Sequence, residues 1–166
     1  MRSFTKFLAG LAVVTMIGAA VAQAQTQSAN VTATATVQQP INVTGAVNLA
    51  FGNVFPGVVK TVAVTAATAG RFDVTGQASA PVLMSFVLPA NLTSGTNNMP
   101  IGTWTGHHNT TNAPSGGTNF TPSAGTTNSA FSATGALFVF VGATVTPATN
   151  QAAGAYTGNV QLTVTY

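Results

Sequence analysis

Apolar and polar residues alternate strictly over Val31–Val37, near the start of the chain. Side chains of a β-strand alternate between its two faces, so this pattern predicts a half-buried strand. Pro40 follows and has no N–H to donate to a strand ladder, so the segment should end there. The residues on its apolar face are Val31, Ala33, Ala35 and Val37.

Short apolar runs between turn residues predict further strands along the chain. The predicted strands are Lys60–Thr65, Arg71–Thr75, Val82–Leu88 and Ala136–Val141. Val82–Leu88 is almost uniformly apolar, which indicates a central strand covered on both faces. The stretch Asn91–Ser132 is rich in Gly, Asn, Thr and Ser, and predicts short strands joined by long loops.

The end of the chain alternates as strictly as its beginning. The apolar positions there are Tyr156, Val160, Leu162, Val164 and Tyr166. We expect one core strand that runs to the last residue, with the first four of these side chains on one face. Eight or nine short strands without any helical period predict an all-β fold, either a sandwich or a barrel.

The first 24 residues have the pattern of a secretory signal peptide. Arg2 and Lys6 precede an apolar run from Phe7 to Val21, and Ala22–Ala24 has the small-residue pattern of a cleavage site. The run is shorter than the ~20 residues that span a bilayer. Removal of residues 1–24 leaves 142 of the 166 residues, enough for one domain without a membrane span.

Charged residues are almost absent after this segment. The mature chain keeps only Lys60, Arg71 and Asp73, and it has no cysteine. Two cations are too few to neutralise phosphates, so binding of nucleic acid is excluded. A surface built from Thr, Asn, Ser, Gln and Gly repels a neighbouring copy only weakly, which favours a protein that packs against copies of itself.

Candidate chemistry is sparse, and we expect neither enzymatic activity nor a cofactor. Asp73 is the one carboxylate side chain of the mature chain, so a pair of catalytic carboxylates cannot form. Asp73 should form a surface ion pair with Arg71. His107 and His108 are expected in a solvated loop without a metal. Trp104 is expected to cover an edge of the core, although a lone exposed tryptophan can also stack on a sugar.

Three segments resemble a group of uncharacterised exported domains of Gram-negative bacteria, namely Leu49–Gly52, Leu88–Leu92 and above all Ala153–Tyr166. More distantly, that ending resembles spore-coat-U-like pilins of the archaic chaperone–usher class, which close on a G-x-Y-x-x-x-V-x-V-x-Y strand. The resemblance implies an immunoglobulin-like antiparallel β-sandwich for residues 41–166. In those pilins the domain lacks one strand, which the N-terminal arm of the next subunit supplies. Many of them carry a disulfide, which this chain cannot form.

Two functions follow as hypotheses. The first is a structural subunit of an extracellular pilus, fibre or surface layer, with residues 25–40 as an arm whose apolar face is donated to a neighbour. Its partners would be copies of itself or related subunits, a periplasmic chaperone and an outer-membrane usher. The second is a monomeric cell-surface or periplasmic binding module, for example for a glycan. In either case the protein would reach the cell surface or the medium through the periplasm of a Gram-negative bacterium. The arm could equally be the first strand of its own sandwich.

Overall fold

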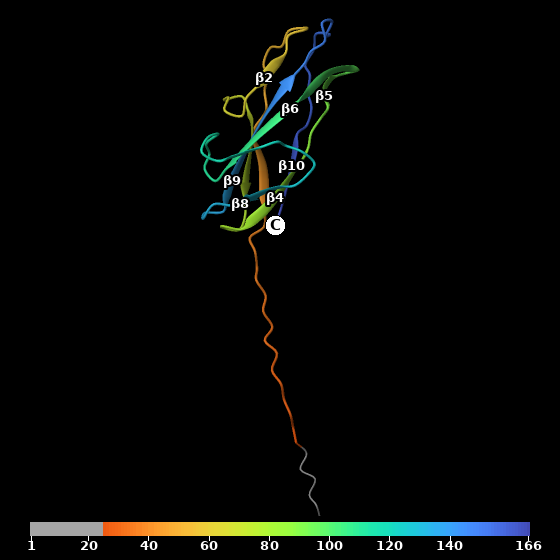
Figure 1. Ribbon diagram of the computed structural model, residues 1–166. Helices are drawn as coiled ribbons and strands as arrows, with labels where there is room; N and C mark the ends of the chain where they lie inside the picture. The colour runs from red at the N-terminus through yellow and green to blue at the C-terminus, as the bar shows by residue number, and fades with distance from the viewer. Residues whose placement is uncertain (1–24) are drawn as a thin grey trace, which may run out of the picture. The chain divides into compact units, whose positions relative to one another are not determined.

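The computed structural model describes residues 25–166, so the predicted signal peptide lies outside the described residues (Figure 1). The chain divides into two units, Met1–Thr36 and Val37–Tyr166. In the first unit, residues 25–36 form no strand and are exposed. The second unit is an all-β domain.

Ten strands and no helix are present in residues 25–166. The strands are β1 (Asn42–Val47), β2 (Lys60–Val62), β3 (Gly70–Thr75), β4 (Pro81–Val87), β5 (Asn91–Ser94), β6 (Asn97–Asn109), β7 (Thr118–Phe120), β8 (Thr127–Ala130), β9 (Ala136–Val145) and β10 (Gln161–Thr165). Most are short, and turn residues such as Gly, Pro and Asn are frequent between them, as expected for an all-β sequence.

The strands form two antiparallel sheets. The larger sheet has seven strands in the order β1-β3-β9-β6-β5, with β2 paired to β9 and β7 paired to β6. The smaller sheet has the order β10-β4-β8. The two sheets pack face to face as a β-sandwich, which confirms the predicted fold class.

The main core lies between the sheets and follows the alternation of the sequence. On β9, Leu137 and Val139 are fully buried, and they pack against Met84 of β4 and Leu162 of β10. A second cluster, at the other end of the sandwich, gathers around Val145. Its buried members are Phe51, Val62, Ala69, Met99, Ile101, Ala143 and Val145.

Three predicted segments of the domain differ from the structure. The predicted strand Lys60–Thr65 ends at Val62, because Val64 and Thr65 belong to a turn. β4 is central in its sheet, but only one of its faces is covered, because Leu83 and Val87 point away from the core and are 37% and 62% exposed. The loop-rich stretch Asn91–Ser132 contains β6, the longest described strand. A β-bulge between Gly102 and Thr105 shifts its alternation partway along, which hides the strand pattern in the sequence.

The sandwich has two ends, the base and the tip. The base is the end at which Gln39, residues 76–80, residues 132–135 and Tyr166 lie. The tip is the opposite end, with residues 53–59 and 146–151, joined by the bond from the Gly57 N–H to the Ala148 carbonyl (2.9 Å). In Figure 1 the C-terminus marks the base, and β2 and the end of β9 lie toward the tip.

Candidate functional site: an open edge between the sheets

A groove of about 980 Å³ opens between the sheets in the half of the domain nearer the tip. One wall is the end of β1 with the following segment, residues 45–56, and the other is the segment that leads into β10, residues 151–160. Side chains of the larger sheet, among them Phe72, Val141 and Ile101, also line it. The groove therefore opens onto the interior of the sandwich.

The strand order explains why the domain is open there. An immunoglobulin sandwich has strands A-B-E-D in one sheet and C-F-G in the other. Here β1-β3-β9-β6 matches A-B-E-D in both order and sequence, and β4 and β10 match C and F. No described strand lies at the position of G, so β10 is an edge strand.

The free edge of β10 can be assigned to particular residues. The Phe86 N–H donates to the Ser123 carbonyl (2.8 Å), so the main-chain groups of Phe86 point away from β10. Leu162 lies opposite Phe86 in the ladder. Because hydrogen-bonded and non-hydrogen-bonded pairs alternate in antiparallel sheets, Leu162 and Val164 direct their N–H and C=O groups to the unpaired edge. These are the groups that an added strand would bond.

The open position leaves part of the core incompletely covered. Phe72 lies on β3 two residues before the fully packed Val74, yet it is only half-buried. Val47 on β1 is 36% exposed. Leu49 and Val160, on opposite walls of the groove, are also half-buried. A strand in this position would bring apolar atoms against these side chains.

The candidate donor-strand face is exposed in the single chain. Val31, Ala33, Ala35 and Val37 are all exposed, and Val31 and Val37 are each 93% exposed. The described residues contain no strand over Val31–Val37, and β1 begins only at Asn42. The strand that the alternation predicts is thus unpaired within residues 25–166.

The C-terminal candidates divide into two groups. Leu162 and Val164 are buried on β10, as predicted. Tyr156 and Val160 precede the strand and line the groove, so the prediction of one continuous strand to the last residue is wrong. The reason is a bridge between Thr157 and Thr93, with N–H to C=O bonds of 2.8 and 3.0 Å, which holds this segment to β5 instead of β4.

Tyr166 contributes hydrogen bonds at the base of the domain, unlike the other C-terminal candidates. Its side chain is 43% exposed, but its hydroxyl accepts the Gln77 N–H (2.8 Å) and donates to the Gln39 carbonyl. The Gln39 N–H in turn donates to the Gln77 side-chain oxygen (3.2 Å). These bonds fasten Gln39 to the base of its own domain.

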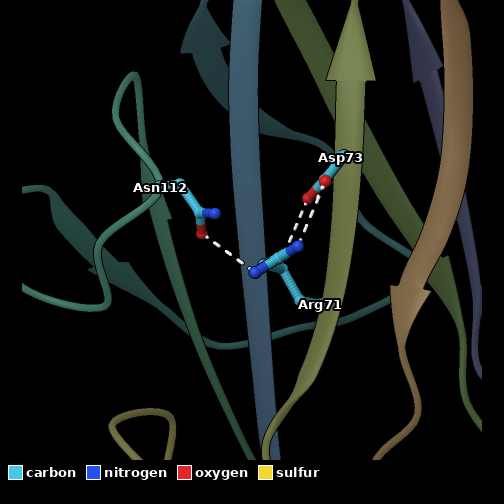
Figure 2. A network of polar contacts seen from close by, with 3 residues as sticks. All are labelled: Arg71, Asp73 and Asn112. Atoms are coloured by element: carbon cyan, nitrogen blue, oxygen red, sulfur yellow. Dashed lines mark hydrogen bonds and ion pairs between the residues drawn. The ribbon is translucent and has the colours of Figure 1, made fainter. Parts of the chain in front are cut away.

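Arg71 and Asp73 form the expected ion pair on the outer face of β3. The Arg71 Nε lies 2.8 Å from Asp73 Oδ1, and a second nitrogen lies 3.3 Å from Oδ2. Figure 2 shows the guanidinium held on its other side by the Asn112 side chain of the β6–β7 loop, at 3.1 Å. Both carboxylate oxygens are bonded to the guanidinium, so the arrangement stabilises the loop and offers no free acid or base.

The two histidines lie on β6, which corrects the expectation of a solvated loop. They point to opposite faces of the sheet, as neighbours in a strand must. His107 is 4% exposed, and its Nδ1 lies 2.7 Å from Asn119 Oδ1. His108 is half-buried on the inner side, with Nδ1 3.1 Å from Ser129 Oγ. Burial lowers the pKa of His108, and the neighbouring His107 lowers it further.

Neither His107 nor His108 belongs to a group of metal-ligating side chains in the described part of the chain. No group of three metal-ligating side chains occurs within residues 25–166. Trp104 is half-buried and packs against both core clusters, as the prediction of an edge cover requires. In the same part of the chain, no helix has the length and apolarity needed to cross a membrane.

The groove is a feature that local sequence pattern does not reveal. Its walls come from segments more than 90 residues apart, so no local motif marks them. One signal is present: Val47, Leu49 and Phe51 continue the alternation of a strand beyond the point at which β1 ends.

Fold and open edge together define a class of protein, an immunoglobulin-like β-sandwich in which no strand of the described chain fills the position beside the last strand. The chain belongs to a family described as a domain of unknown function, DUF4402, which it matches over residues 18–166. No curated protein and no solved structure matches it.

Proposed function

We propose that this protein is a non-catalytic structural subunit of an extracellular pilus, fibre or surface layer, assembled by β-strand complementation. The observation that carries the proposal is the combination of a free edge on β10, a groove beside the segment that leads into β10, and an unpaired, alternating arm in the same chain. Each copy would donate residues 25–39 to the groove of a neighbour. The same exchange repeated along a row of copies would give a linear polymer.

The arm has the length and pattern that the groove requires. Seven residues of extended chain, Val31–Val37, span ~23 Å, about the length of one strand of a sandwich. Its apolar face would turn toward the half-buried Phe72 and Val160, and its threonines toward solvent. Full burial of a valine side chain contributes ~1.5–3 kcal/mol, so Val31 and Val37 would be the anchors.

Main-chain hydrogen bonds would supply much of the remaining affinity. Ala33 and Ala35 bury little surface, but the free N–H and C=O groups of Leu162 and Val164 offer a ladder to an incoming strand. A long unpaired edge is a hazard for a freely diffusing monomer because it invites pairing with other chains. For a subunit that assembles through this edge, the same property is useful.

Charge and location support the same role. The only charged side chains in residues 25–166 are Lys60 and the paired Arg71 and Asp73, so copies can approach without desolvating many ions. The signal-peptide pattern of residues 1–24 supports export through the periplasm of a Gram-negative bacterium to the cell surface or medium. The resemblance of the C-terminal segment to chaperone–usher pilins supports a periplasmic chaperone and an outer-membrane usher as partners.

The alternative, a monomeric glycan-binding module, has less support. Trp104, the side chain expected to stack on a sugar in that alternative, is half-buried and packs against the core. His107 and His108, the other polar candidates, lie on opposite faces of β6.

Deletion of residues 25–39 tests the proposal. The shortened domain should stay monomeric and be less stable than the same domain supplied with a peptide of the arm sequence. At a peptide concentration of 100 times its dissociation constant, the gain is ~2.7 kcal/mol. Unheated gel electrophoresis and size-exclusion chromatography of the full mature chain should show a ladder of oligomers that the deletion removes.

Matched substitutions in the arm separate its two faces. Val31→Asp and Val37→Asp should block assembly because each would bury a charge. Thr32→Asp and Thr36→Asp place the same charge on the opposite face and should assemble much like the unchanged chain. Equal behaviour of the two pairs, or a full-length chain that stays monomeric at high concentration and gains nothing from the peptide, would refute donation of the arm.

A further inference from the structure

The turn at the tip carries an exposed apolar patch that lies mostly outside the groove. Phe55, Val58 and Val59 are 67%, 55% and 57% exposed. They lie within five residues of one another, and Phe55 also lines the end of the groove. These three side chains form the tip patch.

The tip patch is built on an ordered turn. The Val58 N–H donates to the Phe55 carbonyl (3.1 Å), and Pro56 and Gly57 occupy the two central positions. Gly57 has a φ of +70°, as the third residue of a type II turn requires. The Gly57 N–H is bonded to Ala148, so the turn is tied to the neighbouring loop. Its apolar side chains are therefore held in place at the surface.

The direction of a donated strand determines which end of the next copy reaches this tip. A strand at position G runs antiparallel to F, and β10 runs from the tip toward the base. The donated arm would therefore run from base to tip, and Val37, its last apolar residue, would end beside the tip patch. This step rests on the proposed function.

The tether between the arm and its own domain is very short. Gln39 is fastened to the base of its own domain by bonds to Gln77 and Tyr166. Only Gln38 separates it from Val37, and two consecutive residue steps span at most ~7 Å. The base of the donating copy must then lie directly against the tip of the accepting copy.

We infer that the tip patch is a second contact between copies, and that it packs against the base of the copy that donates the arm. The base presents small uncharged residues, with Ala78, Ser79 and Ala133 exposed. Close approach of the two surfaces would bury the tip patch without desolvating any charged side chain of the base. The contact would hold successive domains end to end and make the polymer stiff at each joint.

Because the chain has no cysteine, introduced pairs can test this contact. A full mature chain with Val58→Cys and Ala78→Cys should form a disulfide-linked ladder under oxidation when it is assembled. A chain with Val58→Cys and Asn128→Cys is the matched control, since Asn128 is exposed on β8 and should not meet the tip. Cross-linking of Ala78→Cys alone would mean that two bases meet, which overturns the inferred direction.

A second measurement does not depend on disulfide geometry. Val58→Asn with Val59→Asn should raise the concentration needed for half-maximal assembly about tenfold, since two half-exposed valines lose their burial. Val87→Asn, at an equally exposed valine on the outer face of β4, should leave it unchanged. Normal assembly of the double variant, together with the absence of a V58C–A78C cross-link, would overturn the contact between tip and base. That result would leave the donation of the arm untouched, because the Val31→Asp and Val37→Asp variants test it separately. A chain that never assembles would overturn both.

Discussion

Replacement of a core leucine by alanine should cost different amounts of stability in the two sheets. Leu137 is fully buried on β9, between β3 and β6 in the interior of the larger sheet. Leu162 is 8% exposed on β10, the edge strand beside the empty position. The removed atoms are the same in both variants, so any difference reports how the surroundings respond to the cavity.

The expected magnitudes follow from that response. Leucine-to-alanine changes in protein cores cost ~2–5 kcal/mol, and the cost increases with the volume of the cavity that remains. β9 is bonded on both sides, so the space left by Leu137→Ala cannot collapse, and we expect a loss of ~4 kcal/mol, in the upper part of that range. β10 is bonded on one side only and can relax, so we expect ~2–3 kcal/mol for Leu162→Ala.

Urea unfolding at neutral pH measures both values in the domain without residues 25–39, in which the edge of β10 stays open. Trp104 is the single tryptophan of the chain and packs against both core clusters, so its fluorescence reports loss of the core. Equal denaturant slopes for the two variants are needed before their free energies are compared. A loss for Leu162→Ala that equals or exceeds that for Leu137→Ala would show that β10 is held as firmly as a central strand, and would refute the open-edge reasoning.

Four further outcomes are expected. N-terminal sequencing of the exported protein should begin at Gln25, and an intact Met1 would contradict processing. A double-mutant cycle on Arg71 and Asp73 should give a coupling of at most ~1 kcal/mol, since both side chains are partly exposed and salt screens them; several kcal/mol would mean a buried pair. The lowered pKa of His108 means that the unfolded chain takes up its proton first, so stability should fall as the pH drops below about 6.5, with a slope of at most ~1.4 kcal/mol per pH unit. His108→Gln should remove that part of the slope, and an unchanged slope would assign it elsewhere. Tyr166→Phe should cost ~1 kcal/mol and make the chain around Gln39 easier for a protease to cleave, because Gln39 loses its anchor; unchanged cleavage there would show that the anchor does not hold this point of the chain.

Strands with clear alternation were predictable from local pattern. The predicted Arg71–Thr75 and Ala136–Val141 lie within β3 and β9, and alternate side chains of these strands, such as Val74 and Leu137, are buried. The scarcity of charge likewise limits the possible chemistry through composition alone. In both cases the sequence suffices, because a strand face depends on a few neighbouring residues and a charge count depends on no contact at all.

Other features depended on contacts between distant segments. His107 lies on the outer face of β6 but is buried, because Asn119 of β7 and the chain at Gly117 lie against its ring, although its neighbours in sequence indicate a loop. The bridge from Thr157 to Thr93 keeps the last strand short. Neither contact changes the local alternation of apolar and polar residues, because each one joins segments that are not neighbours in the sequence.

The open edge beside β10 is the clearest case of this kind. Val31–Val37 and Leu162–Val164 have the same alternating pattern, yet the apolar face of the second is buried while the first is exposed and unpaired in the described chain. Alternation of apolar and polar residues indicates that a segment can bury one face. Only the arrangement of the sheets determines whether a strand of the same chain is available to pair with it. The physical reason is that strand pairing is satisfied by any compatible edge, in the same chain or in another, and sequence pattern does not distinguish the two.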